Sequence, residues 1–490
     1  MPKQTIDISK GWMPDLLPED VSAVGGLVKA RNVLPVSGNY LPVNDKSVYN
    51  TTAASGTPIR GYYVQSSDGS FYNFLGTSTK LYRFSKTAMT DVTKVAATYN
   101  AVYWDFATYG SWLIATDYEH APQVLKDLSA GTNFVNLGGT PPKAKYCLMV
   151  NGHLILAFID TGTVSPKKLQ WSARENPELW TASLATGAGS QDIPDLMGVI
   201  TGLAAIGDEF AVFAENSITR GYYMGGQYTF GFKWNYINNI GCFYPSSLIS
   251  IGNLVFFWSR NSIYMWDGSG YPKEIGSLLK KSVIPNVNFS YSHMIYPVHD
   301  KENTLIIWGY PEGSSTIINK LIAYNYAEDK WTGPIEISGS TIFMGNTGGF
   351  TIDEVTSIID TVNIPIDSTY WKGGTINLLV ADTDGKIKTL TGTPLESEIE
   401  SGEFHDNDTV MMVKKAWLSV YGLVGAGSVS LKHRYSPIDA QTASNPASIK
   451  SDGSADLRTS NRRMAINMKA TDFTRIGKSI AVEVDGTGRR

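Results

Sequence analysis

The sequence has 490 residues, with 41 Lys or Arg, 45 Asp or Glu and a formal charge of −4 at pH 7. Proteins that bind nucleic acid tightly usually have a basic excess, so this balance disfavours strong phosphate binding and allows only passive contact with DNA. Hydrophobic residues make up 42% of the chain, which disfavours disorder, and no apolar run is long enough to predict insertion into a membrane.

Residues 1–55 are rich in Pro, Gly and Val. Their prolines argue against a helix or a central strand, because proline lacks the backbone N–H that both require; they are Pro14, Pro18, Pro35 and Pro42. We therefore expect an extended N-terminal arm that lies on another surface, such as that of a neighbouring subunit.

Residues 56–393 repeat a pattern of strand, tight turn, strand and hairpin. In one unit the strand Tyr146–Val150 is followed by the turn Asn151-Gly152 and the apolar strand Leu154–Phe158. Six such units recur at intervals of roughly 40–55 residues, which is the blade period of a β-propeller. A continuously apolar second strand indicates that neighbouring sheets cover both of its faces. A long β-sandwich is the competing interpretation.

A seventh, fainter unit would take its strands from residues 341–344, 370–371, 376–380 and 387–390. The sequence therefore predicts an all-β fold with a six- or seven-bladed propeller, and it does not choose between the two numbers.

Residues 394–490 predict a small antiparallel domain that resembles a β-sandwich. Four alternating segments carry this prediction: residues 414–423, 428–435, 463–469 and 479–484. Four glutamates at the start of this region alternate with apolar or small residues and form one acidic face: Glu396, Glu398, Glu400 and Glu403. We expect a solvated edge strand there, although such a face could also meet a basic partner.

Few residues suggest a catalytic, metal-binding or cofactor-binding site. Cys147 and Cys242 lie in apolar surroundings, which predicts two buried free thiols rather than a disulfide or a metal site. Asp117, Glu119 and His120 form the densest titratable cluster within the repeats, and we expect them in a solvated loop. The sequence predicts no catalytic residue, no metal and no cofactor, so we do not expect an enzyme.

One motif points to a family. Trp171 and Ser172 end a predicted strand, and Pro177 and Trp180 follow in the next turn. This pattern resembles the Trp-Ser, Pro, Trp signature of propeller-bearing virion proteins of tailed bacteriophages. The layout of arm, propeller and C-terminal β domain is similar to that of the tail nozzle, or tail tube, protein of short-tailed (podovirus-like) phages.

The resemblance implies a structural role in the virion tail. Nozzle proteins of this family form a homo-hexameric ring below the adaptor, or head-to-tail connector, and support tail fibres or spikes. Their channel retains the end of the double-stranded genome and conducts it during ejection, without reading its sequence. Such a protein is made in the cytoplasm of the host bacterium. A slightly acidic chain is compatible with DNA that must slide.

The alternative is a propeller-type glycosidase or depolymerase that acts on a surface polysaccharide of the host. This activity requires two carboxylates about 5–10 Å apart at the mouth of the propeller.

Overall fold

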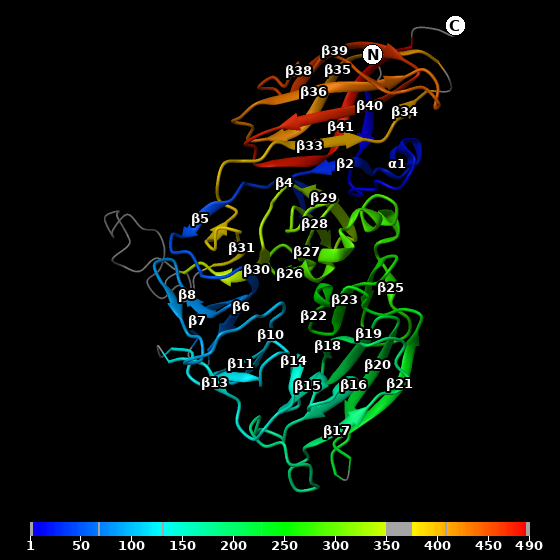
Figure 1. Cartoon of the computed structure of the whole chain (residues 1–490). Helices are drawn as coiled ribbons and strands as arrows, with labels where there is room; N and C mark the ends of the chain where they lie inside the picture. The colour runs from blue at the N-terminus through cyan, green and yellow to red at the C-terminus, as the bar shows by residue number, and fades with distance from the viewer. Residues whose placement is uncertain are drawn as a thin grey trace.

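The computed structural model describes residues 3–66, 69–129, 132–226, 228–348, 375–406 and 409–486. It is almost entirely antiparallel β-structure, arranged as a ring of sheets with a second lobe above it (Figure 1). The ring takes the chain from blue through green to yellow, whereas orange and red strands form most of the upper lobe.

The described part of the ring contains seven sets of four hydrogen-bonded strands, which we number sheets I to VII. Sheets I and II consist of β6 (Pro58–Gln65), β7 (Phe71–Thr77), β8 (Leu81–Phe84) and β9 (Met89–Asp91), then β10 (Asp105–Tyr109), β11 (Trp112–Thr116), β12 (Gln123–Leu125) and β13 (Val135–Asn136). Sheets III and IV consist of β14 (Lys143–Val150), β15 (His153–Asp160), β16 (Val164–Trp171) and β17 (Gly189–Asp192), then β18 (Ile200–Ile206), β19 (Glu209–Ala214), β20 (Ser217–Tyr223) and β21 (Phe230–Asn238).

Sheets V and VI consist of β22 (Ile249–Ile251), β23 (Leu254–Trp258), β24 (Ile263–Trp266) and β25 (Lys273–Glu274), then β26 (Tyr296–Asp300), β27 (Leu305–Tyr310), β28 (Lys320–Asn325) and β29 (Lys330–Ile335). Short 3-10 turns precede or link these two sheets: η1 (Pro245–Ser247), η2 (Ser277–Leu279), η3 (Ile284–Asn286) and η4 (Phe289–Met294). Sheet VII combines β30 (Thr341–Asn346), β31 (Ile376–Ala381) and β32 (Ile387–Thr389) with an N-terminal strand, β5 (Ser47–Asn50). Residues 370–371, which we expected in this unit, lie outside the described residues.

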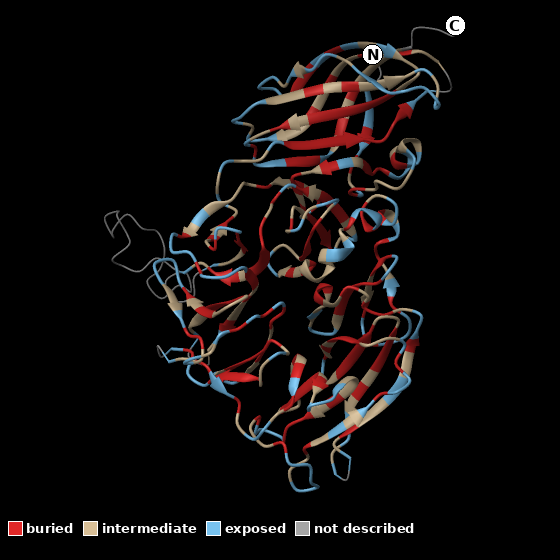
Figure 2. Cartoon of the chain, in the orientation of Figure 1, coloured by how far each residue is buried: buried red, intermediate tan, exposed pale blue. Residues whose placement is uncertain are grey.

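The ring closes through the first strand of each sheet. Each first strand contacts the first strand of the next sheet, and β30 of sheet VII returns to β6 of sheet I. The second strands are buried (red in Figure 2), since neighbouring sheets cover both faces. This arrangement confirms the expected β-propeller.

The N-terminal segment is not a detached arm. It contains β1 (Lys3–Asp7), α1 (Pro18–Val24), β2 (Leu27–Arg31), β3 (Val33–Val36) and β4 (Asn39–Pro42). Strands β1 and β4 pair with the C-terminal strand β41 (Arg475–Gly486), β2 lies between β29 and β33 (Ser397–Ser401), and β5 completes sheet VII. The segment that we expected on another surface thus pairs with this chain's own sheets.

The expectation that the prolines exclude a helix is wrong for α1. Pro18 is the first residue of this helix, where no intrahelical partner exists for an N–H and where the fixed φ of proline suits the helix. The helix ends at Gly25, which adopts φ 77° and donates its N–H to the carbonyl of Ser22.

The upper lobe contains two sheets. One has the order β3-β4-β41-β35-β39, with β1 beside β41; the other continues from β29 of sheet VI through β2, β33, β40, β36 and β37. The strands not yet given are β34 (Phe404–His405), β35 (Met411–Tyr421), β36 (Gly427–Arg434), β37 (Thr442–Ala443), β38 (Ala447–Ser448), β39 (Ser454–Asn461) and β40 (Arg463–Ala470). One hydrophobic cluster joins the two sheets and extends to Trp258 and Trp308 in the ring.

Both cysteines are buried and free, as expected. Burial raises the pKa of the Cys242 thiol to about 12, so this side chain behaves as a small apolar group.

A partly buried group of three charges joins the residue before β5 to the other strands of sheet VII. The Lys46 ammonium lies 2.6 Å from Asp382 Oδ2, and that of Lys388 lies 2.7 Å from the same atom. Burial by itself would raise the pKa of Asp382, but hydrogen bonds from the two lysines lower it to about 2. A carboxylate whose folded pKa is depressed stabilises the protein above its unfolded pKa, and this stability is lost as the pH falls through the folded pKa.

We therefore expect Asp382→Asn to lower the free energy of unfolding by about 2 kcal/mol at neutral pH. The gap between wild type and variant should close between about pH 4 and pH 2, where Asp382 of the wild type becomes protonated. Urea unfolding at several pH values measures this gap. Asp195→Asn, at an exposed position, is the matched control, and a gap that does not change with pH would contradict the assigned ion pair.

Candidate functional site

The family-like motif is a structural turn that follows β16. Trp171, Ser172, Pro177 and Trp180 are all buried. The Ser172 Oγ accepts a hydrogen bond of 3.0 Å from the Leu154 N–H and donates to the carbonyl of Ala173. The Ala173 N–H donates to the Leu179 carbonyl at 2.7 Å, which closes the turn around Pro177.

The two tryptophans pack against different neighbours of sheet III. Trp171 Nε1 donates to the Gly187 carbonyl at 2.9 Å, and its ring meets the ring of Phe230 in sheet IV edge-to-face at 5.2 Å. Trp180 belongs to the hydrophobic cluster between sheets II and III. Gly139 (φ 77°) approaches so closely that an added Cβ would lie 1.7 Å from the Glu178 carbonyl oxygen and 3.1 Å from the Trp180 ring. The motif therefore packs sheet III against both adjacent sheets.

The cluster of Asp117, Glu119 and His120 differs from the solvated loop that we expected. Asp117 follows β11 directly and is buried, with 4% of its surface exposed, whereas Glu119 is exposed. Asp117 accepts from the His120 N–H at 2.9 Å and contacts His120 Nδ1 at 2.6 Å. The expectation is wrong for Asp117 because its carboxylate closes the turn beneath His120.

A cavity of about 630 Å³ lies among the first strands of the ring. Its walls include Tyr62, Tyr296 and Phe343, with Arg60, His299 and Lys301 as cationic or titratable groups. The described lining contains no Asp or Glu, so it does not provide the carboxylate pair that the glycosidase alternative requires. A volume of this size suits a small ligand.

An ion pair that the sequence analysis missed lies at this cavity. The Arg60 guanidinium lies 3.4 Å from Asp105 Oδ1 and donates to the Tyr103 hydroxyl at 3.3 Å. Asp105 Oδ2 accepts from the Cys147 N–H at 3.0 Å. Burial raises the pKa of Asp105, and Arg60 opposes this shift. The contacts link β6, β10 and β14, so the pair has a structural role. In the sequence, the position of the charged Asp105 between Trp104 and Phe106 is the only indication of this pair.

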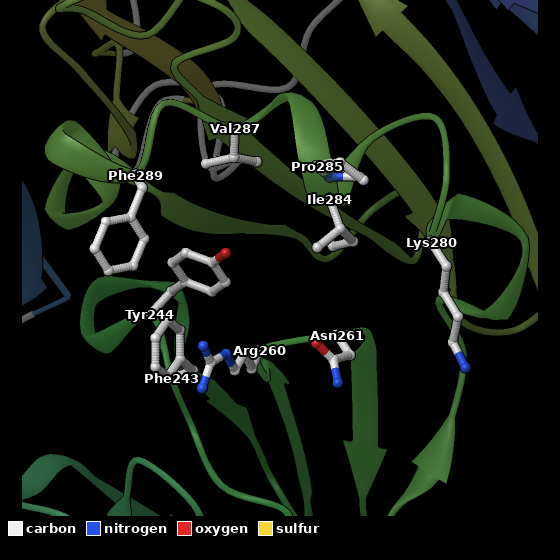
Figure 3. Close-up of a pocket in the computed structure, with 9 residues that line it drawn as sticks. All are labelled: Phe243, Tyr244, Arg260, Asn261, Lys280, Ile284, Pro285, Val287 and Phe289. Atoms are coloured by element: carbon white, nitrogen blue, oxygen red, sulfur yellow. The ribbon is translucent and has the colours of Figure 1, made fainter.

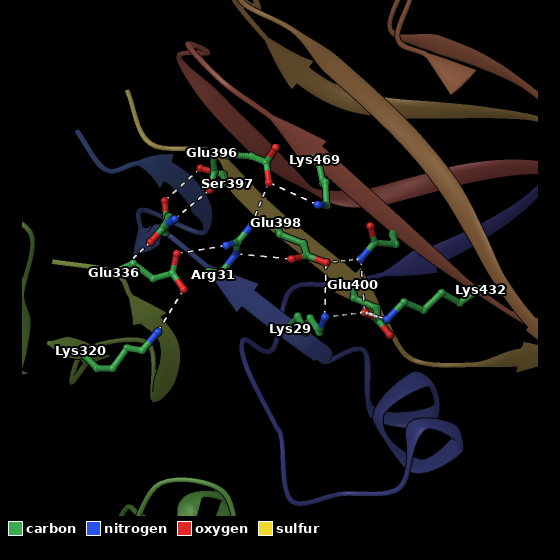
Figure 4. Close-up of polar contacts among 12 residues, drawn as sticks. Lys29, Arg31, Lys320, Glu336, Glu396, Ser397, Glu398, Glu400, Lys432 and Lys469 are labelled. Carbon is green, nitrogen blue, oxygen red and sulfur yellow. Dashed lines mark hydrogen bonds and ion pairs between the residues drawn. The ribbon is translucent and has the colours of Figure 1, made fainter. Parts of the chain in front are cut away.

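The acidic face of β33 is enclosed rather than solvated. Glu398 and Glu400 are 8% and 3% exposed, because β33 is an internal strand between β2 and β40. The expected edge strand is therefore wrong, and the basic partner lies within the chain. Glu400 lies 2.6 Å from the Lys432 ammonium, and Asn467 Nδ2 donates to Glu398 Oε1 at 2.8 Å (Figure 4).

The two remaining glutamates are also paired. The buried carboxylate of Glu403 lies 2.7 Å from Arg434, and the half-exposed Glu396 lies 2.9 Å from Arg31. Burial raises the pKa of Glu398, but the amide of Asn467 and the charges of Lys29, Arg31 and Lys469 outweigh it and lower the pKa. Glu398 is thus held in its ionised form.

Arg31 of β2 connects this face to the ring. Its guanidinium lies 2.9 Å from Glu396 and 3.1 Å from Glu336, which follows β29 (Figure 4). Glu336 in turn lies 3.0 Å from the ammonium of Lys320 in sheet VI. We call the set Arg31, Lys320, Glu336, Glu396 and Glu398 the joint, because it spans the boundary between ring and upper lobe.

Within the described residues, no group of three or more His, Cys, Asp or Glu side chains is placed to hold a metal ion. No helix in the same ranges is long and apolar enough to cross a membrane.

No protein-family model matches this sequence, and no curated protein matches it significantly. Solved structures resemble the chain at low identity. The extracellular domain of the putative hybrid two component system BT4673 from B. thetaiotaomicron is 11% identical with a TM-score of 0.43, and the match covers 78% of this chain and 44% of that protein. YCF48 bound to D1 peptide is 9% identical, with a TM-score of 0.40 and coverage of 72% and 97%. The computationally designed Ika8 protein is 9% identical, with a TM-score of 0.39 and coverage of 74% and 94%.

Removal of a large side chain from the Trp-Ser, Pro, Trp turn should destabilise the ring. We expect Trp180→Ala to cost about 3–5 kcal/mol of unfolding free energy, because it leaves a cavity between sheets II and III. Chemical denaturation measures the loss. Trp234→Ala, at a position 42% exposed, is the control, and equal small losses for both variants would contradict the packing described.

Loss of the ion pairs of the joint should change both the stability of the protein and the shape of its unfolding transition. Arg31→Met keeps much of the apolar stem but removes the contacts to Glu336, Glu396 and Glu398, and we expect a loss of about 1–2 kcal/mol for this partly buried network. Because these contacts span the two lobes, differential scanning calorimetry should show a broader or split transition. Arg458→Met, on the exposed side of β39, should leave the transition unchanged, and identical traces for the two variants would exclude this role for Arg31.

Proposed function

We propose that this chain is a structural subunit of the short tail of a bacteriophage, a nozzle or tail tube protein. In this proposal a seven-bladed propeller and a β-sandwich-like upper lobe form one rigid block. Six copies form a ring whose central channel retains genomic DNA and conducts it during ejection.

The observation that carries the proposal is the connection between the two lobes. Strand β2 pairs with β29 of the ring on one side and with β33 of the upper lobe on the other. The joint adds ion pairs across the same boundary, and one hydrophobic cluster runs through both lobes. A subunit that must hold its shape while DNA passes requires such a rigid connection, whereas domains that move independently are usually joined by small, polar interfaces.

In this proposal the DNA conduit runs along the axis of the hexameric ring, between the subunits. The net charge of −4 favours a channel in which the phosphate backbone is not retained. The Trp-Ser, Pro, Trp turn supports the family resemblance, and its buried position explains it as a packing element.

The remaining partners follow from the same role. A connector ring would lie above the hexamer, and tail fibres or spikes would attach to its outside. The chain would act without a catalytic site or a cofactor.

The test is negative-stain imaging of purified virions labelled with an antibody against this chain. Label on a short tail below the portal, with sixfold averages, is the expected result. Label confined to peripheral spikes, or absent from virions, would overturn the proposal.

A further inference from the structure

A second cavity of about 630 Å³ opens at the seam between sheets V and VI (Figure 3). Four short segments form it: residues 243–244 before η1, the β23–β24 turn at Arg260 and Asn261, Lys280 directly after η2, and the stretch from η3 to the first residue of η4. None of the residues discussed as functional candidates above lines it.

The polar groups of this pocket come mainly from one side. In Figure 3 the Arg260 side chain extends from the β23–β24 turn toward Phe243, Asn261 lies beside it on the same turn, and the Tyr244 hydroxyl points toward the space between these residues and Ile284. The turn is fixed by a hydrogen bond of 2.9 Å from the Ser259 N–H to the Ser262 carbonyl. Three polar side chains, Arg260, Asn261 and Tyr244, thus lie close together in the wall of the pocket.

The charge of the pocket is positive and unbalanced. Its described lining holds Arg260 and Lys280 but no Asp or Glu. Lys280 is neutralised by Glu274 at 2.5 Å, whereas Arg260 forms no ion pair in the described part of the chain. A guanidinium that stays unpaired beside a cavity is suited to bind a carboxylate through two parallel hydrogen bonds.

Aromatic and aliphatic side chains form the other walls. The Phe243 and Phe289 rings stack with centroids 5.9 Å apart, and the Arg260 guanidinium lies 5.5 Å from the Phe243 centroid. This contact holds the guanidinium beside the Phe243 ring, which also lines the pocket. Phe289 is 64% exposed, and Ile284, Pro285 and Val287 face it across the cavity.

We propose that this pocket binds an acidic segment of a partner protein, in which a carboxylate side chain is flanked by apolar or aromatic residues. The carboxylate pairs with Arg260 and accepts from Asn261 or Tyr244, and the flanking side chain packs on Phe289 and Pro285. A free phosphate would use the cation but leave the exposed aromatic wall uncovered. Aromatic and arginine side chains are enriched at protein interfaces. The inference does not depend on the proposed tail function.

The test uses two probes on the full chain: the acetylated tripeptide amide Phe-Asp-Leu and its uncharged analogue Phe-Asn-Leu. Saturation-transfer NMR and titration calorimetry measure their binding. We expect the acidic probe to bind with a dissociation constant in the millimolar range or below. The uncharged analogue should bind about tenfold more weakly, because loss of one charge-assisted contact has this effect.

Amino-acid substitutions distinguish a site that binds an acidic peptide from a site that binds any small anion. Arg260→Gln and Phe289→Ala should each weaken the acidic probe about tenfold, Arg260→Lys should fall between Arg260→Gln and wild type, and Arg458→Gln should have no effect. Circular dichroism confirms that each variant is folded. Three results would overturn the proposal: equal affinity for the two probes, no binding of the acidic probe to folded wild type, or binding that inorganic phosphate abolishes while Phe289→Ala leaves it unchanged.

Discussion

The position of β2 between β29 and β33 is the constraint on which the rest of the structure depends. Without this five-residue strand the ring and the upper lobe would share no continuous sheet. Its two basic side chains, Lys29 and Arg31, lie over the acidic face of β33. A short strand from the N-terminal segment thus decides how two large parts of the molecule are oriented.

The acidic face of β33 also explains why this pairing has one register. Glu398 and Glu400 point to one side, whereas Ile399 between them is 1% exposed and belongs to the central hydrophobic cluster. A slip of one residue would place carboxylates in that cluster and the isoleucine among lysines. Buried ion pairs contribute little net stability, because desolvation offsets the attraction. Their effect here is on register and orientation.

Packed side chains fill the spaces between the sheets of the ring, whereas the pocket proposed to bind a peptide lies at its surface. Arg60 and Asp105 pair beside the cavity among the first strands, and the tryptophans of the family-like turn fill the spaces between sheets. By contrast, Arg260 lies at a seam where two sheets meet and has no carboxylate partner in the described residues. A propeller provides such seams wherever adjacent sheets diverge, so connecting turns rather than strands supply the polar groups.

The sequence by itself determined the repeating strands, the buried cysteines and the apolar second strands, since these follow from local alternation and turn chemistry. It could not place residues 1–50, because strand pairing over hundreds of residues leaves no local pattern: β5 pairs with β32 and β1 with β41.

The prediction that Pro18 excludes a helix is wrong because it depends on where the helix begins. A proline that breaks a helix in its interior is favoured at the first helical position. Likewise, the alternation of Glu398 and Glu400 with apolar residues predicts a solvated edge strand. The tertiary structure shows that β2 and β40 pair with β33 on either side. The pocket at Arg260 required the same information, because Phe289 and Arg260 are brought together only by the closure of sheet V against sheet VI.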